Sequence, residues 1–237
     1  NNSSSAYMSA VGVTDTIRNA LSLFRETLPV LARRVLPVLA LAQAIELLPL
    51  SGSFLLLLVL GLASWLGVAW AGAYSLRVLL GARFHTTVVS PSATSLALFL
   101  LVGAYVTLTA TLGALLFVLP ALLVIAAASL APIFALQHHC GPFEAVALST
   151  DCTKGSLLSV AAVLVLAWLA IVLASTLLGS AAAIAGPVTV LVTYVASVAA
   201  AFVGLFHYAV VVVLFERLHP NPPLQGTPAG PPAAPLS

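Results

Sequence analysis

The sequence has very few charged residues for its length. Of 237 residues, 8 are Lys or Arg and 6 are Asp or Glu, whereas 62% are hydrophobic and the mean hydropathy is +1.18. A soluble domain carries roughly 25% charged residues because its surface must be solvated. The composition therefore excludes a soluble globule and indicates a polytopic membrane protein with lipid as its main solvent.

Cysteine, lysine and nucleotide-binding motifs are also scarce or missing. The two cysteines, Cys140 and Cys152, exclude a disulfide-rich secreted framework. The single lysine, Lys154, lies outside the apolar runs, which excludes a retinal Schiff base. The motifs GxxxxGK[ST], GxGxxG and HExxH do not occur. We expect no catalytic residues, no metal, no cofactor and no nucleic-acid partner, so the protein is predicted not to be an enzyme.

Long apolar runs dominate what is present. Each is near the roughly 20 residues that a helix needs to cross hydrocarbon. They are continuously apolar rather than alternating, which indicates helices and not a closed barrel. The predicted fold class is all-α, a polytopic bundle of six transmembrane helices with two short interfacial amphipathic helices. The six spans are placed at 30–49, 54–80, 94–117, 119–137, 157–179 and 188–215.

The two ends of the chain differ in composition from this domain, which covers residues 11–218. Residues 1–10 are polar and lack an apolar signal-peptide core, so we expect a disordered stretch or a cloning remnant, with Met8 as a candidate natural start. Residues 219–237 are proline-rich, which predicts a cytoplasmic tail that is disordered or strapped along a partner.

The basic residues give the orientation. If the N-terminus is inside, five of them fall in inner segments and three lie close enough to the same side to extend to it. Both termini are therefore expected in the cytoplasm. The five are Arg18, Arg25, Arg83, Lys154 and Arg217, and the three are Arg33, Arg34 and Arg77.

The stretch VTDTIRNALSLF, which precedes the first span, has an amphipathic helical pattern. Apolar residues recur from Val13 to Leu28 at helical spacing, with polar residues on the other side. We expect a helix lying on the inner leaflet, where Arg18 and Arg25 contact anionic headgroups. The alternative is an extension that packs on nothing.

The polar segment QHHCGPFEAVALSTDCTKGS, residues 137–156, joins the fourth and fifth spans. Its centre reads as a short helix that begins near Pro142 and ends by Gly155. We expect this helix to be interfacial, with Ser149 and Lys154 contacting headgroups or a partner. Lys154 then lies at the C-terminal end of the helix, where positive charge is favoured.

A soft-metal site is the alternative reading of the same segment, using His138, His139 and Cys140. Cys140 and Cys152 are separated by roughly 15–18 Å along such a helix. Neither CxxC nor HxxxH spacing occurs. The pattern therefore favours an interfacial turn over a metal site.

Two polar residues inside the predicted spans are candidates for a functional role. Glu46 is the one carboxylate there, and it is either a proton-relay or cation site or an interfacial glutamate that reaches water near Pro49. His207, in the last span, has no second histidine at a matching depth to share a haem. We expect His207 to be packed and hydrogen-bonded.

The segment 131–163, APIFALQHHCGPFEAVALSTDCTKGSLLSVAAV, resembles the YciC-like bacterial inner-membrane proteins. It also resembles the membrane domain attached to some glycerophosphodiester phosphodiesterases. TIRNALSLFRETLPVLARRVLPVL is similar to the amphipathic beginning of these proteins, and the likeness extends over residues 11–218. The positions that match the "A-l-x-x-S-x-x-l-t-k-G" motif of the group are Ala145, Ser149, Thr153, Lys154 and Gly155.

Two positions depart from the pattern of this group, namely Gln137, where glutamate is frequent, and Thr150, where tryptophan is common. The hydrolase domain has no counterpart here, so its activity is not carried over. The resemblance implies a bacterial inner-membrane bundle associated with envelope or lipid homeostasis. We expect a non-enzymatic accessory, scaffold or lipid-interacting protein whose partners are membrane lipids and other membrane proteins. A small permease that uses Glu46, or a membrane metal or redox protein, is the alternative.

Overall fold

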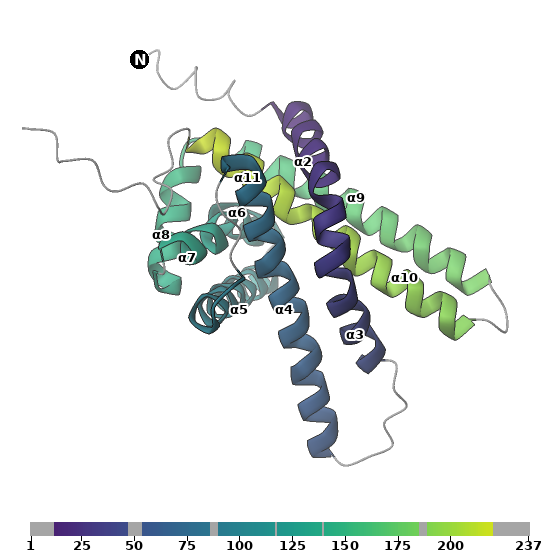
Figure 1. Cartoon of the computed structure of the whole chain (residues 1–237). Helices are drawn as coiled ribbons and strands as arrows, with labels where there is room; N and C mark the ends of the chain where they lie inside the picture. The colour runs from purple at the N-terminus through teal and green to yellow at the C-terminus, as the bar shows by residue number, and fades with distance from the viewer. Residues whose placement is uncertain are drawn as a thin grey trace, which may run out of the picture.

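The computed structural model describes residues 12–46, 54–85, 90–116, 118–138, 140–184 and 189–219. All regular secondary structure in these ranges is α-helical, which confirms the predicted class (Figure 1). The helices are α2 (Val13–Arg34), α3 (Leu36–Glu46), α4 (Phe54–Phe84), α5 (Ala93–Leu116), α6 (Val118–Ala128), α7 (Ala131–His138), α8 (Pro142–Thr153), α9 (Leu157–Ile184), α10 (Thr189–Gly204) and α11 (Phe206–Leu218).

Five helical stretches are long and apolar enough to cross a membrane. They are Leu58–Phe84, Ala93–Leu112, Ala121–His138, Leu157–Ser180 and Leu191–Leu218. The pair α2 and α3, bent by 58°, makes a sixth if it counts as one span. The apolar helices are therefore compatible with a multi-pass membrane protein, while the number six and the interfacial role of the two short helices stay predictions.

The first predicted span begins differently in the structure. The sequence places the boundary between the amphipathic helix and the span near Pro29, but α2 continues through Pro29 and the chain bends at Val35. The buried face of α2 includes Leu23, Thr27 and Leu31 and packs on α4 and α11. Such tertiary packing holds a helix together across a locally unfavourable residue. The same contacts contradict the alternative in which this segment packs on nothing.

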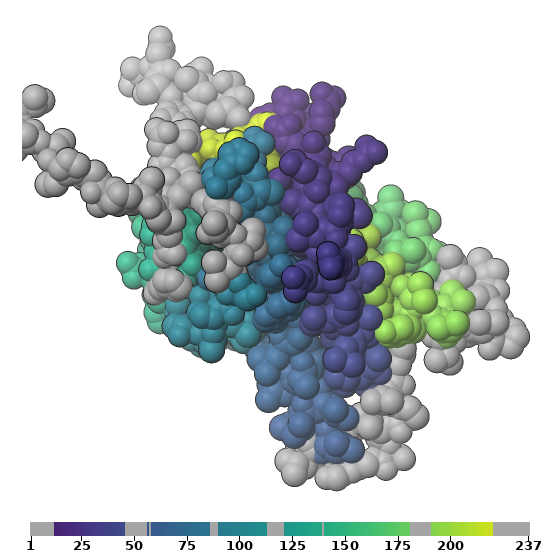
Figure 2. Space-filling view, viewed as in Figure 1, coloured from purple at the N-terminus to yellow at the C-terminus, as the bar shows by residue number. Residues whose placement is uncertain are grey.

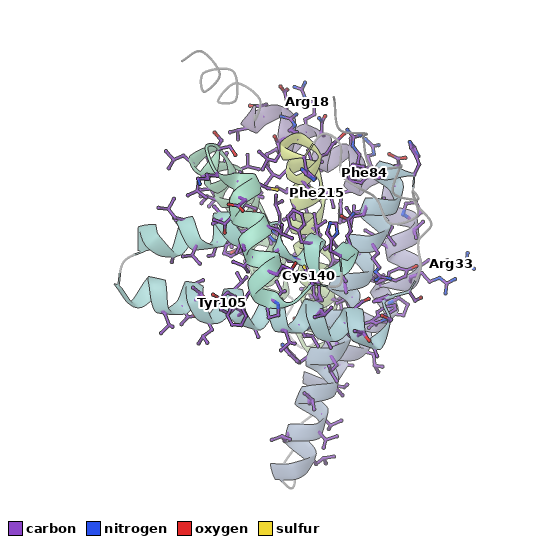
Figure 3. All side chains as sticks on the ribbon, turned by 90° about the vertical axis from the view of Figure 1, so that its left-hand side faces the viewer. Arg18, Arg33, Phe84, Tyr105, Cys140 and Phe215 are labelled. Atoms are coloured by element: carbon purple, nitrogen blue, oxygen red, sulfur yellow. The ribbon has the colours of Figure 1, made fainter. Side chains whose placement is uncertain are left out.

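The helices form a packed hub from which three arms extend. The hub consists of α2, residues 71–84 of α4, α7, α8 and α11. The arms are α3 with residues 54–70 of α4, α5 with α6, and α9 with α10. Figures 1 and 2 show α4 projecting below the hub and α9 with α10 reaching to the right, and Figure 3, turned by 90°, shows the α5–α6 arm extending to the left.

Helix α11 is the centre of the hub. Its residues Ala209 to Phe215 are all buried, and α2, α4 and α9 pack around it. The ring of Phe215 is fully buried between the rings of Phe84 and Phe134, whose centroids lie at 6.1 and 5.6 Å (Figure 3). These edge-to-face contacts join α4, α7 and α11 through one buried ring.

Polar contacts connect hub helices with one another and with the start of the α5–α6 arm. The Arg83 guanidinium donates two hydrogen bonds of 2.7 Å to the Glu216 carboxylate, which joins α4 to α11. Arg217 donates to the Gly12 carbonyl oxygen at 3.3 Å and so connects α11 to the start of α2. The Arg77 guanidinium donates to Ser95 Oγ at 2.9 Å, at the start of α5.

The described charged side chains are confined to the hub and Lys154, whereas most of the exposed large apolar side chains belong to the arms. Every charged residue whose side chain the structure describes belongs to the hub or to Lys154, the residue directly after α8. The described parts of the arms instead expose large apolar side chains. These include Leu58, Val59, Leu62, Trp65, Leu101, Leu108, Leu112, Leu169, Val172, Leu173, Leu177, Leu191 and Val195.

The helix predicted between the fourth and fifth spans is confirmed. Helix α8 begins at Pro142 and ends at Thr153. The Lys154 backbone N–H donates to the Thr150 carbonyl oxygen at 3.0 Å, as expected of a helix C-cap. Gly155 follows with a φ of 93°, a left-handed conformation in which glycine has no steric penalty.

Candidate functional site

Arg18 and Arg25 lie on the outer face of α2. Both are exposed, and between and after them Leu21 and Leu28 expose 58% and 41% of their surface. The four positions follow helical spacing, so basic and apolar side chains alternate along one exposed stripe. Such a mixed stripe is typical of a helix at the boundary between headgroups and acyl chains. We refer to Arg18, Leu21, Arg25 and Leu28 as the outer stripe of α2.

Ser149, another predicted contact residue, lies inside the protein. Its side chain is fully buried and bridges the break between α6 and α7. The Leu130 backbone N–H donates to Ser149 Oγ at 3.1 Å, and the Ser149 hydroxyl donates to the Ala127 carbonyl oxygen at 2.6 Å. The hydroxyl therefore satisfies backbone groups that the helix break releases, and in this arrangement it does not face a headgroup.

The remaining predicted site residues are placed only in part. Lys154 is exposed at the end of α8, beside exposed Asp151. Glu46 is the last residue of α3, and the structure describes its backbone but not its side chain. His139 also lies outside them. The structure thus leaves the proposed roles of Glu46 and the His–His–Cys cluster as predictions.

The two cysteines are free thiols at opposite ends of α8. Burial raises the pKa of the Cys140 thiol, and the Glu144 charge raises it further. Burial also raises the pKa of Cys152, together with the charge of Asp151. A raised pKa disfavours the thiolate, which is the form that binds soft metals or attacks electrophiles. Within the described residues, His, Cys, Asp and Glu side chains form no group of three that is able to hold a metal ion.

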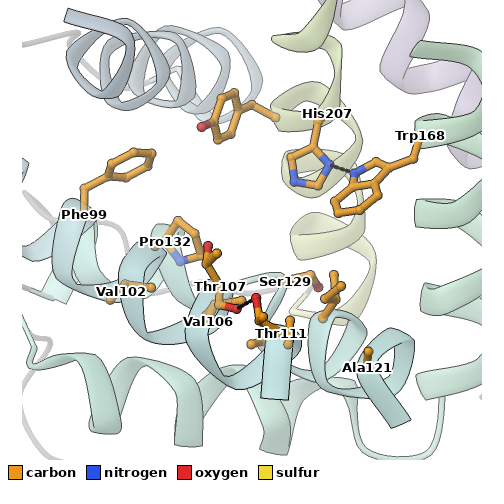
Figure 4. A pocket seen from close by; sticks show the side chains of 15 residues that line it. Phe99, Val102, Val106, Thr107, Thr111, Ala121, Ser129, Pro132, Trp168 and His207 are labelled. Atoms are coloured by element: carbon orange, nitrogen blue, oxygen red, sulfur yellow. Dashed lines mark hydrogen bonds between the residues drawn. The ribbon is translucent and has the colours of Figure 1, made fainter. Parts of the chain in front are cut away.

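A cleft of about 510 Å³ lies where the α5–α6 arm diverges from α9 (Figure 4). Phe99, Val102 and Val106 of α5 form one side, Pro132 of α7 lies at its base, and Trp168 of α9 lies opposite. None of the described residues that line it carries a formal charge at neutral pH. A volume of this size and an apolar lining are typical of small-molecule sites.

The polar edge of the cleft is the Trp168–His207 pair. The indole Nε1–H of Trp168 donates to Nδ1 of His207 at 3.1 Å, which confirms the predicted hydrogen-bonded histidine (Figure 4). An indole N–H is a donor only, so Nδ1 must be the unprotonated nitrogen of a neutral ring. The ring proton then sits on Nε2, which Figure 4 shows on the side of the cleft toward Pro132.

Tyr208 closes the cleft toward α4, where Gly72 leaves room for it. A Cβ atom added at Gly72 would lie 2.6 Å from Tyr208 Oη and 3.1 Å from its Cζ. Real Cβ atoms do not approach this closely, so the tyrosine ring occupies space that only glycine leaves open at this helix crossing. The shape of the cleft therefore depends on a residue of α4 outside its lining.

Replacing Gly72 with alanine is expected to lower the free energy of unfolding by about 1–2 kcal/mol, because the added methyl group displaces the Tyr208 ring. Unfolding by sodium dodecyl sulfate, titrated into protein in a mild detergent, measures this change. Gly61→Ala is the matched control, since nothing lies within 4 Å of its Cβ position. Tyr208→Phe should partly restore stability in the Gly72→Ala background. Equal effects at Gly61 and Gly72 would contradict the close contact.

Sequence reasoning found His207 but missed the cleft. Trp168 and His207 are 39 positions apart, and no periodic pattern connects α9 with α11. Pro132 was the one available signal, because proline in a span marks a break where backbone and side chains separate. No known protein family, curated protein sequence or solved structure matches the chain. Arguments about function therefore rest on the residues themselves.

Proposed function

We propose that this chain is a non-enzymatic integral membrane protein that binds lipids, with the charged residues of its hub at the membrane surface and its arms in the hydrocarbon. One observation carries the proposal. Every charged residue with a described side chain lies in the hub or directly after α8, whereas the arms expose large apolar side chains. Contact of such apolar surfaces with lipid carries no free-energy penalty, whereas their exposure to water is unfavourable.

The outer stripe of α2 supplies the lipid contact at the surface. Arg18 and Arg25 stand beside exposed leucines, so the guanidinium groups reach headgroup phosphates while Leu21 and Leu28 enter the acyl region. Each such arginine contributes about 1 kcal/mol of attraction to an anionic leaflet. On the positive-inside argument this leaflet is the cytoplasmic one, with both termini in the cytoplasm.

The YciC-like resemblance supports the bacterial inner membrane as the location and lipid homeostasis or the support of other membrane proteins as the context. Ser149 and Gly155 match the motif of that group, and here they belong to the buried α6–α7 bridge and the end of α8. The motif thus supports a shared geometry of the α6–α7 break and of α8, rather than a shared activity. The permease alternative depends on Glu46, and nothing in the described residues favours it.

Native mass spectrometry of the protein released from membranes in mild detergent tests the proposal. We expect the wild-type chain to retain anionic phospholipid, such as phosphatidylglycerol. The double variant Arg18→Gln/Arg25→Gln should retain roughly five- to thirtyfold less, since two attractions of about 1 kcal/mol each are lost.

Arg18→Lys/Arg25→Lys is the matched control, because it keeps both charges and the helix. Its lipid retention should stay close to that of the wild type. Retention that is unaffected by the glutamine pair would remove the outer stripe of α2 as a lipid contact. A wild-type chain that is extracted from membranes by alkaline carbonate would contradict the integral membrane assignment itself.

A further inference from the structure

We infer that the cleft bounded by α5, α6, α7, α9 and α11 binds an uncharged lipid that carries a carbonyl oxygen, which accepts a hydrogen bond from Nε2 of His207. The inference rests on the proposed function in one respect, namely that the arms lie in lipid. It goes further because it assigns a separate site, away from the outer stripe of α2, and a ligand class.

The lining excludes a charged headgroup. No Lys, Arg, Asp or Glu is among the described residues around the cleft. A phosphate or ammonium group placed there would lose its hydration without gaining an ion pair, which is strongly unfavourable. The apolar residues contributed by α5, including Phe99, Val102 and Val106, suit a hydrocarbon tail.

Hydrogen bonding inside the protein selects the polar end of the ligand. The Thr111 hydroxyl donates to the Thr107 carbonyl oxygen at 2.8 Å, and the Ser129 hydroxyl donates to the Ala126 carbonyl oxygen at 2.9 Å. The protons of these two hydroxyls are thus already used, and Thr107 and Tyr208 add two further hydroxyls to the lining. Because Trp168 fixes the tautomer of His207, the Nε2–H of His207 is a donor held in place at the polar edge of the cleft. A ligand that pairs with this donor must offer an acceptor oxygen.

Aromatic rings border this donor. The rings of Trp168 and His207 meet edge to face at 6.0 Å, and the rings of His207 and Tyr208 at 5.7 Å. The ring centroids of Phe99 and Tyr208 lie 6.2 Å apart, so Phe99 extends this aromatic border, and Pro132 also lines the cleft. A quinone head presents a ring carbonyl to such a border, whereas diacylglycerol presents an ester carbonyl. Both are uncharged carbonyl lipids.

Lipid has access to the cleft from the space between two arms. Leu101 and Leu108 of α5 and Leu169 of α9 expose more than half of their surface on the two arms that border the cleft. In the proposed orientation these faces contact hydrocarbon, so a dissolved neutral lipid enters laterally without crossing a polar layer.

Titration of the purified protein with decylubiquinone or dioctanoylglycerol, followed by native mass spectrometry, tests the inference. We expect one molecule of one of these lipids to bind, and the lipid that binds identifies the source of the carbonyl. His207→Phe keeps a ring but removes the donor, and it should weaken binding about tenfold. His207→Gln keeps an N–H donor and should weaken binding less. His138→Phe, which removes an exposed histidine outside the cleft, should have no effect.

Gly103→Leu provides a second variant that does not touch His207. Nothing lies within 4 Å of the Cβ position of this lining glycine, so a side chain can start there without a clash, and a leucine is expected to fill part of the cleft. We expect it to block binding while the protein stays folded. Binding of neither lipid, or equal binding by wild type, His207→Phe and Gly103→Leu, would overturn the inference. Phosphatidylglycerol retained in the same spectra would then leave the proposed function standing.

Discussion

Replacing Phe215 with alanine is expected to lower the free energy of unfolding by about 3 kcal/mol. The substitution removes roughly 100 Å³ of side chain from a fully buried position, and a cavity costs about 24 cal/mol per Å³. Loss of the edge-to-face contacts with Phe84 and Phe134 adds about 0.5–1.5 kcal/mol. The hydrophobic transfer term adds little here, because the unfolded chain remains in detergent or lipid.

Unfolding by sodium dodecyl sulfate measures this loss, with circular dichroism reporting helix content. Phe143→Ala is the matched control, since Phe143 is 71% exposed and contacts only the edge of Tyr105 among the aromatic rings of the described residues. Its effect should stay below about 1 kcal/mol. If Phe215→Ala and Phe143→Ala lower the free energy of unfolding by the same amount, the hub is not the packed centre of the protein.

Replacing Ser149 with alanine is expected to cost about 2 kcal/mol. The substitution leaves the Leu130 N–H without the acceptor at 3.1 Å, and the Ala127 carbonyl oxygen without the donor at 2.6 Å. A buried backbone donor left without a partner costs about 1–3 kcal/mol. Because these groups hold the break between α6 and α7, hydrogen exchange in 126–134 should also accelerate.

Thr150→Ala is the control for this position. The Thr150 hydroxyl is exposed and donates to the Val146 carbonyl oxygen of its own helix at 2.8 Å. Its loss should change stability by less than about 0.5 kcal/mol and leave exchange in 126–134 unchanged. Accelerated exchange in both variants would mean that the effect comes from α8 as a whole rather than from the bridge.

The helices were predictable because composition and run length determine them in a chain this apolar. The bounds of α8 were predictable too, since Pro142 and Gly155 are local signals for a helix start and stop. The bend at Val35 was not, because Pro29 and Pro37 are equivalent local signals for a break, and only the packing of α2 on α4 and α11 carries the helix through Pro29 so that it ends just before Pro37. Local rules thus predicted the elements but not their bends.

In the candidate sites, too, local patterns were predictable and contacts between distant helices were not. Arg18 and Arg25 were predictable as exposed residues from the amphipathic pattern of α2. Ser149 lies on a helix whose neighbours the sequence does not reveal, so its bond to Leu130 was missed. Residues from five helices line the cleft, and the hydrogen bond from Trp168 to His207 forms only when α9 and α11 pack side by side. Pairwise contacts over such sequence distances leave no periodic trace in a single sequence.

The location of the cleft in lipid is tested most directly by the fluorescence of Trp168. A variant with Trp65→Phe and Trp70→Phe leaves Trp168 as the only tryptophan, and it is reconstituted in vesicles with or without lipids brominated on the acyl chains. We predict strong quenching by the brominated chains and weak quenching by acrylamide from water, because the cleft opens between apolar arms. Strong quenching by acrylamide with no effect of brominated lipid would contradict a lipid-facing cleft and the membrane arrangement of hub and arms.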